Sequence, residues 1–140
     1  MKSQKNTCTA VVVAAGTASR MRGIDKMLAP LNGQPVLLRT VRALAASSRI
    51  GQIIIVTRDD LSASVRALCG GEKKVCAVVP GGATRAESVL NGLRRVKAPV
   101  VAIHDGARPL VTPEVIDTAI SAAEKTGAAA PAVPVHDTIK

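Results

Sequence analysis

A loop of small and basic residues follows the first apolar run of the chain and is suited to binding phosphate. Ala14, Ala15 and Gly16 carry little or no side chain, so the backbone can approach a ligand closely and present N–H groups to it. Arg20 and Lys26 add the positive charge that a polyphosphate requires. The same residues also fit an ordinary surface loop. The loop lacks the GxGxxG and GxxxxGK[ST] patterns, which argues against a dinucleotide-binding domain and a P-loop enzyme.

Asp105 is a second candidate, because it stands directly after the apolar run of residues 100–104. A carboxylate at the end of a buried strand can hold Mg²⁺, which bridges phosphate oxygens and offsets their charge. In the alternative interpretation, Asp105 forms a turn with Gly106 and pairs with Arg108. We interpret His104 as a packed structural residue rather than a general base.

A pair of glycines, Gly81 and Gly82, precedes a predicted helix and would allow close approach of a ligand. Thr84 and Glu87 have the spacing of a capping box, which predicts the start of that helix. Ser88 lies one turn in and could hydrogen-bond the edge of a base. The alternative is that this segment only caps the helix.

Each of these segments follows a strand-like run. Short, continuous apolar runs predict buried strands at residues 9–14, 52–57, 75–79, 100–104 and 128–135. Helical patterns and capping residues predict helices at residues 36–46, 60–68, 84–96 and 112–127, with Asp60 capping the second and Pro113 in the first turn of the last. Asn32-Gly33 predicts a turn.

The alternation of strands and helices predicts an α/β domain, with a mostly parallel sheet between two layers of helices. Ligands of such sheets bind beyond the carboxyl ends of the strands. The loops at residues 15–30, 80–84 and 104–110 should therefore meet at one site.

The composition narrows the class of partner. The chain has 140 residues and no Phe, Tyr or Trp, which argues against nucleic-acid modules that stack bases on aromatic rings. Its net charge of +9 favours anionic partners such as phosphorylated molecules. Its three cysteines form no CxxC pair and match no zinc pattern, so we expect free thiols in a reducing cytoplasm. No apolar run is long enough to cross a bilayer, and we expect no membrane or nucleic-acid partner.

Taken in order, these segments resemble the 2-C-methyl-D-erythritol 4-phosphate cytidylyltransferase family of the non-mevalonate isoprenoid pathway. The first loop is common to many nucleotidyltransferases, whereas the segments ending at Pro109 and Lys140 are more specific. The resemblance covers nearly all of this chain and about the first three-fifths of a typical member. It is carried by residues 10–16 with Arg20, Met21 and Lys26; residues 31–37; Gly81, Gly82, Arg85, Ala86, Ser88 and Val89; residues 104–109; and residues 134–140.

The resemblance implies a Rossmann-like, three-layer fold of the nucleotide-diphospho-sugar transferase type. It implies transfer of a cytidylyl group from CTP to 2-C-methyl-D-erythritol 4-phosphate, with Mg²⁺ as cofactor and release of pyrophosphate. The implied catalytic residues are Arg20 and Lys26, and the implied metal ligand is Asp105. Thr138 would approach the acceptor. The nucleotide would contact Ala14, Ala15, Gly16, Gly81, Gly82, Ser88 and Ala107.

The chain also departs from the family pattern. Ala18 replaces the usual second loop glycine, and Ala83 stands where an acidic residue often follows the two glycines. We expect residues 1–140 to form a single nucleotide-binding domain that lacks the family's C-terminal part, and to be weakly active or inactive alone. That part supplies another metal carboxylate and the arm of a homodimer, so the resemblance implies a homodimer only where it is present.

Two other functions remain open at this point. One is nucleotidyl transfer to another acceptor, such as ribitol 5-phosphate or a sugar 1-phosphate. The other is a non-catalytic module that binds a triphosphate without turnover.

Overall fold

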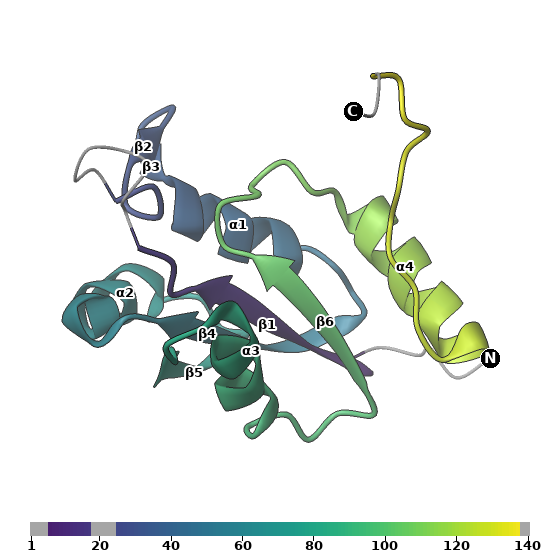
Figure 1. The fold of residues 1–140 in the computed structure, drawn as a ribbon, viewed down its shortest axis with the longest axis horizontal. Coiled ribbons are helices and arrows are strands. Elements are labelled where there is room, and N and C mark those ends of the chain that lie inside the picture. The colour runs from purple at the N-terminus through teal and green to yellow at the C-terminus, as the bar shows by residue number, and fades with distance from the viewer. Residues whose placement is uncertain (1–5, 18–24, 138–140) are drawn as a thin grey trace.

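Four parallel strands form the centre of the molecule. The computed structural model describes residues 6–17 and 25–137. In these residues, β1 (Cys8–Ala14), β4 (Ile50–Thr57), β5 (Val75–Pro80) and β6 (Val100–Asp105) pair in the order β5-β4-β1-β6 (Figure 1). All three pairings are parallel, so every strand ends at the same edge of the sheet. The four strands predicted up to residue 104 are confirmed.

The central strand β1 is buried along its whole length, as its continuous apolar run predicts. Val12 pairs with Ile55 of β4 on one side and with His104 of β6 on the other. Successive side chains point to opposite faces, so Val12 packs with one helical layer and Val11 with the other.

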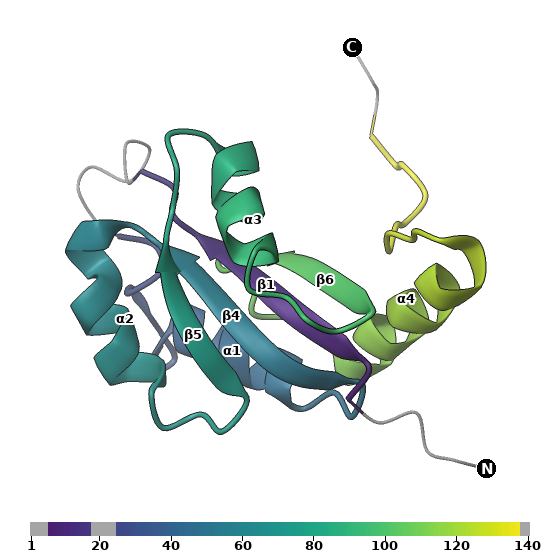
Figure 2. The same cartoon turned by 90° about the horizontal axis from the view of Figure 1, so that it is seen from below.

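Helices cover both faces of the sheet, which confirms the predicted three-layer fold. On one face, α1 (Val36–Ala45), α2 (Ser62–Cys69) and α4 (Pro113–Thr126) pack against the larger apolar cluster. On the other, α3 (Arg85–Leu93) packs against Val11, Val56 and their neighbours (Figure 2). None of the helices among the described residues has the length and hydropathy of a membrane span.

The capping signals around α3 and α4 are confirmed. The Thr84 side chain accepts a hydrogen bond from the Glu87 N–H, and the Glu87 carboxylate accepts one from the Thr84 N–H. Thr112 caps α4 by accepting from the N–H of Val115, and Gly127 ends that helix in the left-handed conformation, at φ 92°.

The predicted turn at Asn32-Gly33 is confirmed, and it closes a short hairpin. Strands β2 (Pro30–Leu31) and β3 (Gln34–Pro35) flank it in an antiparallel pair. Both turn residues have positive φ, 50° at Asn32 and 82° at Gly33, which is the requirement of a two-residue hairpin turn.

Two predictions about secondary structure are wrong. Asp60 does not cap a helix: it lies in a short 3-10 turn, η1 (Asp59–Leu61), and its carboxylate is bound by Arg58 instead. Residues 128–135 form no strand; they are exposed and run back past α4 without joining the sheet (Figure 1). Pro131 and Pro134 cannot donate to a strand ladder, and within the described residues β6 pairs only with β1.

Gly92 allows α3 to lie close to the sheet. A Cβ atom at this position would stand 2.5 Å from a methyl carbon of Val11 and 2.9 Å from one of Val56. Both neighbours belong to buried strands, so neither has room to move aside.

We therefore expect Gly92→Ala to lower the free energy of unfolding by roughly 1–3 kcal/mol, because α3 must shift. Helix propensity alone predicts the opposite sign, since alanine is favoured over glycine in a helix by about 1 kcal/mol. The control is Gly71→Ala, where a Cβ would meet no atom within 4 Å. Urea denaturation of the three proteins measures the difference; a stabilised Gly92→Ala variant would contradict the packing described.

Candidate functional site

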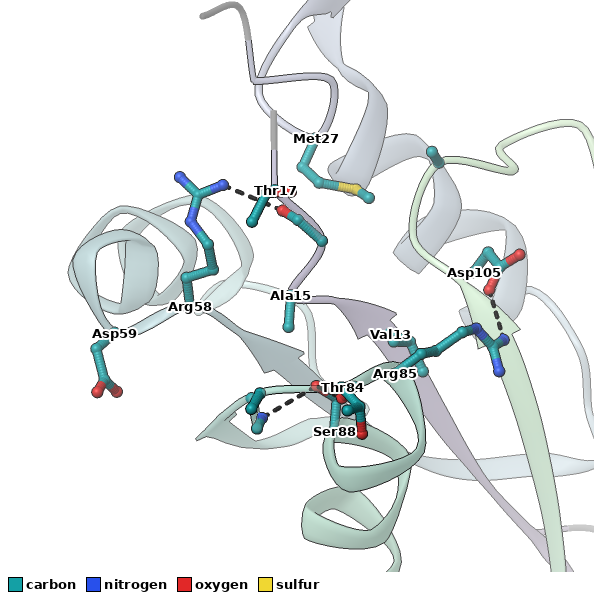
Figure 3. Close-up of a pocket in the computed structure, with 15 residues that line it drawn as sticks. Val13, Ala15, Thr17, Met27, Arg58, Asp59, Thr84, Arg85, Ser88 and Asp105 are labelled. Carbon is teal, nitrogen blue, oxygen red and sulfur yellow. Dashed lines mark hydrogen bonds and ion pairs between the residues drawn. The ribbon is translucent and has the colours of Figure 1, made fainter. Parts of the chain in front are cut away.

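A cavity of about 670 Å³ lies at the carboxyl edge of the sheet. The segments that follow β1, β4, β5 and β6 all contribute to its wall, as the parallel topology requires (Figure 3). The loops at residues 15–30, 80–84 and 104–110 therefore meet as predicted. The lining residues are Val13, Ala15, Gly16, Thr17, Met27, Arg58, Asp59, Gly81, Gly82, Ala83, Thr84, Arg85, Ser88, Asp105 and Ala107.

Most of the residues selected from the sequence lie together in this cavity. Ala14 is buried beneath the wall and does not line it. Lys26 is exposed, beside the lining residue Met27, but is not itself part of the wall. Arg20 and Thr138, like Ala18, lie outside the described residues. The structure brings together Ala15, Gly16, Gly81, Gly82, Ser88, Asp105 and Ala107.

Gly81 is the point at which the β1 and β5 loops meet. A Cβ atom on Gly81 would lie 2.4 Å from the Cβ of Ala15 and 3.0 Å from the Oγ of Ser88. The Gly81 N–H donates to the carbonyl of Thr57 at the end of β4, at 2.8 Å. Only glycine leaves room for three neighbouring segments here, so one wall of the cavity is held in close contact.

Ser88 stabilises the Gly81–Gly82 turn through the hydrogen bonds of its hydroxyl. Its side chain is 2% exposed, and its hydroxyl donates to the Thr84 carbonyl and accepts from the Gly82 N–H, each at 3.0 Å. The hydroxyl proton is thus engaged within the chain, which leaves acceptor capacity on the oxygen. Ala83, where the sequence departs from the family pattern, donates its N–H to Glu87 at 2.6 Å.

Asp105 is held between two arginines, of which Figure 3 shows Arg85. One carboxylate oxygen accepts from Nη2 of Arg85 at 2.8 Å, and the other accepts from Nε of Arg108 at 3.0 Å. The hydrogen bond from Arg85, followed by that from Arg108, holds the pKa of Asp105 below its ordinary value. The side chain is 37% exposed and ionised at neutral pH. The pairing with Arg108 that the sequence left open is confirmed.

His104 lies on the other side of β6 from this cavity. It pairs in register with Val12 and lines a separate apolar space beneath α4, with Leu44 and Ile116. Burial lowers the pKa of His104 below its ordinary value, so the neutral form is favoured. This position agrees with the interpretation of His104 as a packed residue.

Two arginines of the cavity wall, Arg58 and Arg85, were not predicted from the sequence to act at the site. Arg58 directly follows the predicted strand at residues 52–57, so its place at the sheet edge was a signal that could have identified it. Arg85 is the first residue of α3, and only the folded chain shows that it reaches Asp105 across the cavity.

The cavity combines features suited to an anionic ligand. Gly16 lines the cavity with open space where a Cβ would stand, which gives a ligand close access to the backbone. Thr84 and Arg85 place the N-terminus of α3, with its partial positive charge, in the wall. Arg85 adds a guanidinium to the wall, where it is paired with Asp105.

Comparison with known proteins agrees with this geometry. Residues 8–140 match the family model of IspD, 2-C-methyl-D-erythritol 4-phosphate cytidylyltransferase. A relative of that name from Cereibacter sphaeroides is 41% identical over 137 residues, covering 95% of this chain and 61% of the relative. Another from Pelotomaculum thermopropionicum is 43% identical over 139 residues, covering 94% of this chain and 58% of the relative.

A solved structure extends the likeness to three dimensions. The 4-diphosphocytidyl-2C-methyl-D-erythritol synthase from Anaerococcus prevotii superposes with a TM-score of 0.72 at 28% identity, covering 86% of this chain and 52% of that one. The chain spans about three-fifths of the length of the curated relatives it matches. On the match over residues 8–140, the chain belongs to the 2-C-methyl-D-erythritol 4-phosphate cytidylyltransferase family.

Proposed function

We propose that the protein binds CTP in the cavity at the sheet edge and transfers its cytidylyl group to 2-C-methyl-D-erythritol 4-phosphate, releasing pyrophosphate. The observation that carries the proposal is the meeting of Ala15, Gly16, Gly81, Gly82, Ser88, Asp105 and Ala107 in one cavity. Membership of the cytidylyltransferase family supports the identity of the nucleotide and the acceptor.

In this proposal, the two glycine-containing segments bind different parts of the nucleotide. The Gly81–Gly82 turn and the acceptor oxygen of Ser88 face the cytosine, and Ala107 lies by the ribose. Backbone N–H groups near Ala15 and Gly16 bind the phosphates. The close contact of Gly81 with Ala15 supports this arrangement, because it fixes the distance between the base site and the phosphate site.

The reaction needs no nucleophile from the protein. A phosphate oxygen of the acceptor forms a bond to the α-phosphorus of CTP, and the bond from that phosphorus to the β-phosphate oxygen breaks, with its electron pair leaving on pyrophosphate. Two anions must meet, so fixed positive charge and positioning supply most of the rate gain. We assign the catalytic charge to Arg20 and Lys26, and the acceptor contact to Thr138.

Asp105 fits a magnesium ligand in its chemistry. It is an ionised, partly exposed oxygen donor in the cavity wall. Among the described residues no three acidic, histidine or cysteine side chains cluster. The other ligands would come from the nucleotide, from water and, where it is present, from the carboxylate of the family's C-terminal part. When bound, the ion offsets phosphate charge. Arg85 and Arg108 hold the carboxylate until then, and would share it or turn toward the phosphates.

We also propose that the protein acts in the cytoplasm and forms a homodimer where the family's C-terminal arm is present. Both proposals rest on resemblance to the family. Light scattering after size exclusion measures the mass in solution directly.

We expect pyrophosphate release to require both CTP and 2-C-methyl-D-erythritol 4-phosphate, because the cavity selects the base and the acceptor supplies the attacking oxygen. A panel of four nucleoside triphosphates against this acceptor, ribitol 5-phosphate and a sugar 1-phosphate tests it. Calorimetry of nucleotide binding runs in parallel. Preference for another nucleotide would overturn the CTP assignment, and transfer to ribitol 5-phosphate or the sugar 1-phosphate in place of 2-C-methyl-D-erythritol 4-phosphate would overturn the acceptor assignment.

We expect Asp105→Asn to reduce the gain in CTP affinity that Mg²⁺ provides, by about tenfold or 1.4 kcal/mol, because a charged oxygen ligand is lost. Calorimetric titration with CTP, with and without Mg²⁺, measures that gain. The matched control is Asp59→Asn, which neutralises another carboxylate in the same cavity wall. An Mg²⁺ effect that survives Asp105→Asn but is lost in Asp59→Asn would place the metal elsewhere.

A further inference from the structure

We propose that Arg58 is a positioning residue that joins the two ends of the loop between Gly16 and Asp25, so that the phosphate-binding backbone and the turn bearing Lys26 keep a fixed separation. The inference rests on the proposed binding of CTP. Arg58 follows β4 at the sheet edge, and it contacts both the segment after β1 and the segment before the β2–β3 hairpin.

At one end, Arg58 holds the backbone of the first loop. Its Nη1 donates to the carbonyl oxygen of Gly16 at 3.1 Å (Figure 3). Gly16 is exposed in the cavity wall, and no atom lies within 4 Å of where its Cβ would be. Packing therefore does not fix this glycine from its side-chain direction, and the guanidinium supplies a contact that does.

At the other end, Arg58 holds Asp25. Its Nη2 lies 3.3 Å from one carboxylate oxygen of Asp25. The other oxygen accepts from the Met27 N–H at 2.9 Å, and the Asp25 carbonyl accepts from the N–H groups of Leu28 and Ala29 at 3.2 and 3.0 Å. Asp25 thus stabilises the turn that contains Lys26, the residue that follows it. Fixing Asp25 fixes the backbone from which Lys26 extends.

The charges around Arg58 favour this role over direct contact with a phosphate. Besides Asp25, Arg58 binds Asp60 through Nε and Nη2, each at 3.0 Å. One guanidinium therefore faces two carboxylates and a carbonyl. Its charge is largely offset within the chain, and its planar fork is used to fix three segments in place.

Three substitutions distinguish a positioning role of Arg58 from direct contact with a phosphate. Arg58→Ala removes the link entirely. Asp25→Asn removes the ion pair while Asn keeps an oxygen for the Met27 N–H. Asp60→Asn is the matched control, because it weakens the outer anchor and leaves both loop contacts in place. Calorimetry with CTP, and NMR titration with cytidine, report on phosphate and base binding separately.

We expect Arg58→Ala and Asp25→Asn each to lower CTP affinity by about tenfold, since the phosphate groups lose their fixed geometry. Cytidine affinity should stay unchanged, which a general loss of structure would not allow. Asp60→Asn should stay within about twofold, as expected for an exposed pair. The double variant Arg58→Ala/Asp25→Asn should bind CTP no more weakly than Arg58→Ala, because both changes break the same link.

The change in CTP affinity caused by Asp25→Asn distinguishes a positioning role of Arg58 from direct contact with phosphate. If Arg58 binds phosphate directly, freeing it from Asp25 leaves CTP affinity unchanged or raises it, and that result overturns the inference. Should Arg58→Ala fail to fold, Arg58→Lys replaces it, because it keeps the charge but loses the fork that reaches three partners.

Amide hydrogen exchange measured without nucleotide tests the role of Arg58 independently of whether the protein binds CTP. We expect Arg58→Ala to speed exchange at residues 16–17 and 27–29 and to leave β5 and α3 unchanged. If the unsubstituted protein does not bind CTP, the proposed function fails, while exchange still reports whether Arg58 joins the loop ends. Unaltered exchange at both ends would overturn the joining role itself.

Discussion

The parallel pairing of β1 with β4 and β6 is the constraint on which the rest of the molecule depends. Because β1 is buried on both faces, its direction fixes where each loop of the sheet emerges. The helical layers then close over the two faces, and the ends of four strands are left at one edge. Without aromatic side chains, this core relies on the close fit of Val, Ile, Leu and Ala, and on contacts such as that of Gly92 with Val11.

The cavity inherits its shape from that constraint, but its chemistry depends on polar contacts between loops. Gly81 lets the β1 and β5 segments touch, and Ser88 braces the turn between them. Two arginines then join segments far apart in sequence: Arg85 reaches Asp105, and Arg58 reaches Asp25. The guanidinium of Arg85 is thereby held at the cavity by Asp105, where an incoming polyphosphate can compete for it, whereas Arg58 stays engaged with Asp25 and Asp60.

Local signals in the sequence predicted the features that depend on neighbouring residues, such as the Thr84 capping box and the buried run of β1. They failed at Asp60, a residue type that commonly caps helices, because Arg58, two residues earlier, binds its carboxylate instead. They also failed where pairing with another segment decides. Residues 128–135 have the composition of a strand, but they do not pair with the open edge of β6, and Pro131 and Pro134 lack the N–H that pairing would use. The link from Arg58 to Asp25 likewise depends on the order of strands in the sheet.

The central claim is that CTP binds at the carboxyl edge of the sheet, between the β1 and β5 segments. Backbone amide NMR of the 14.4 kDa chain during titration with CTP tests it most directly. The account predicts that the largest shift changes fall at Ala15, Gly16, Gly81, Gly82 and Ala107, which line one cavity. Changes centred instead on the surface formed by Arg39, Arg42 and Leu110, or no saturable change at all, would contradict it.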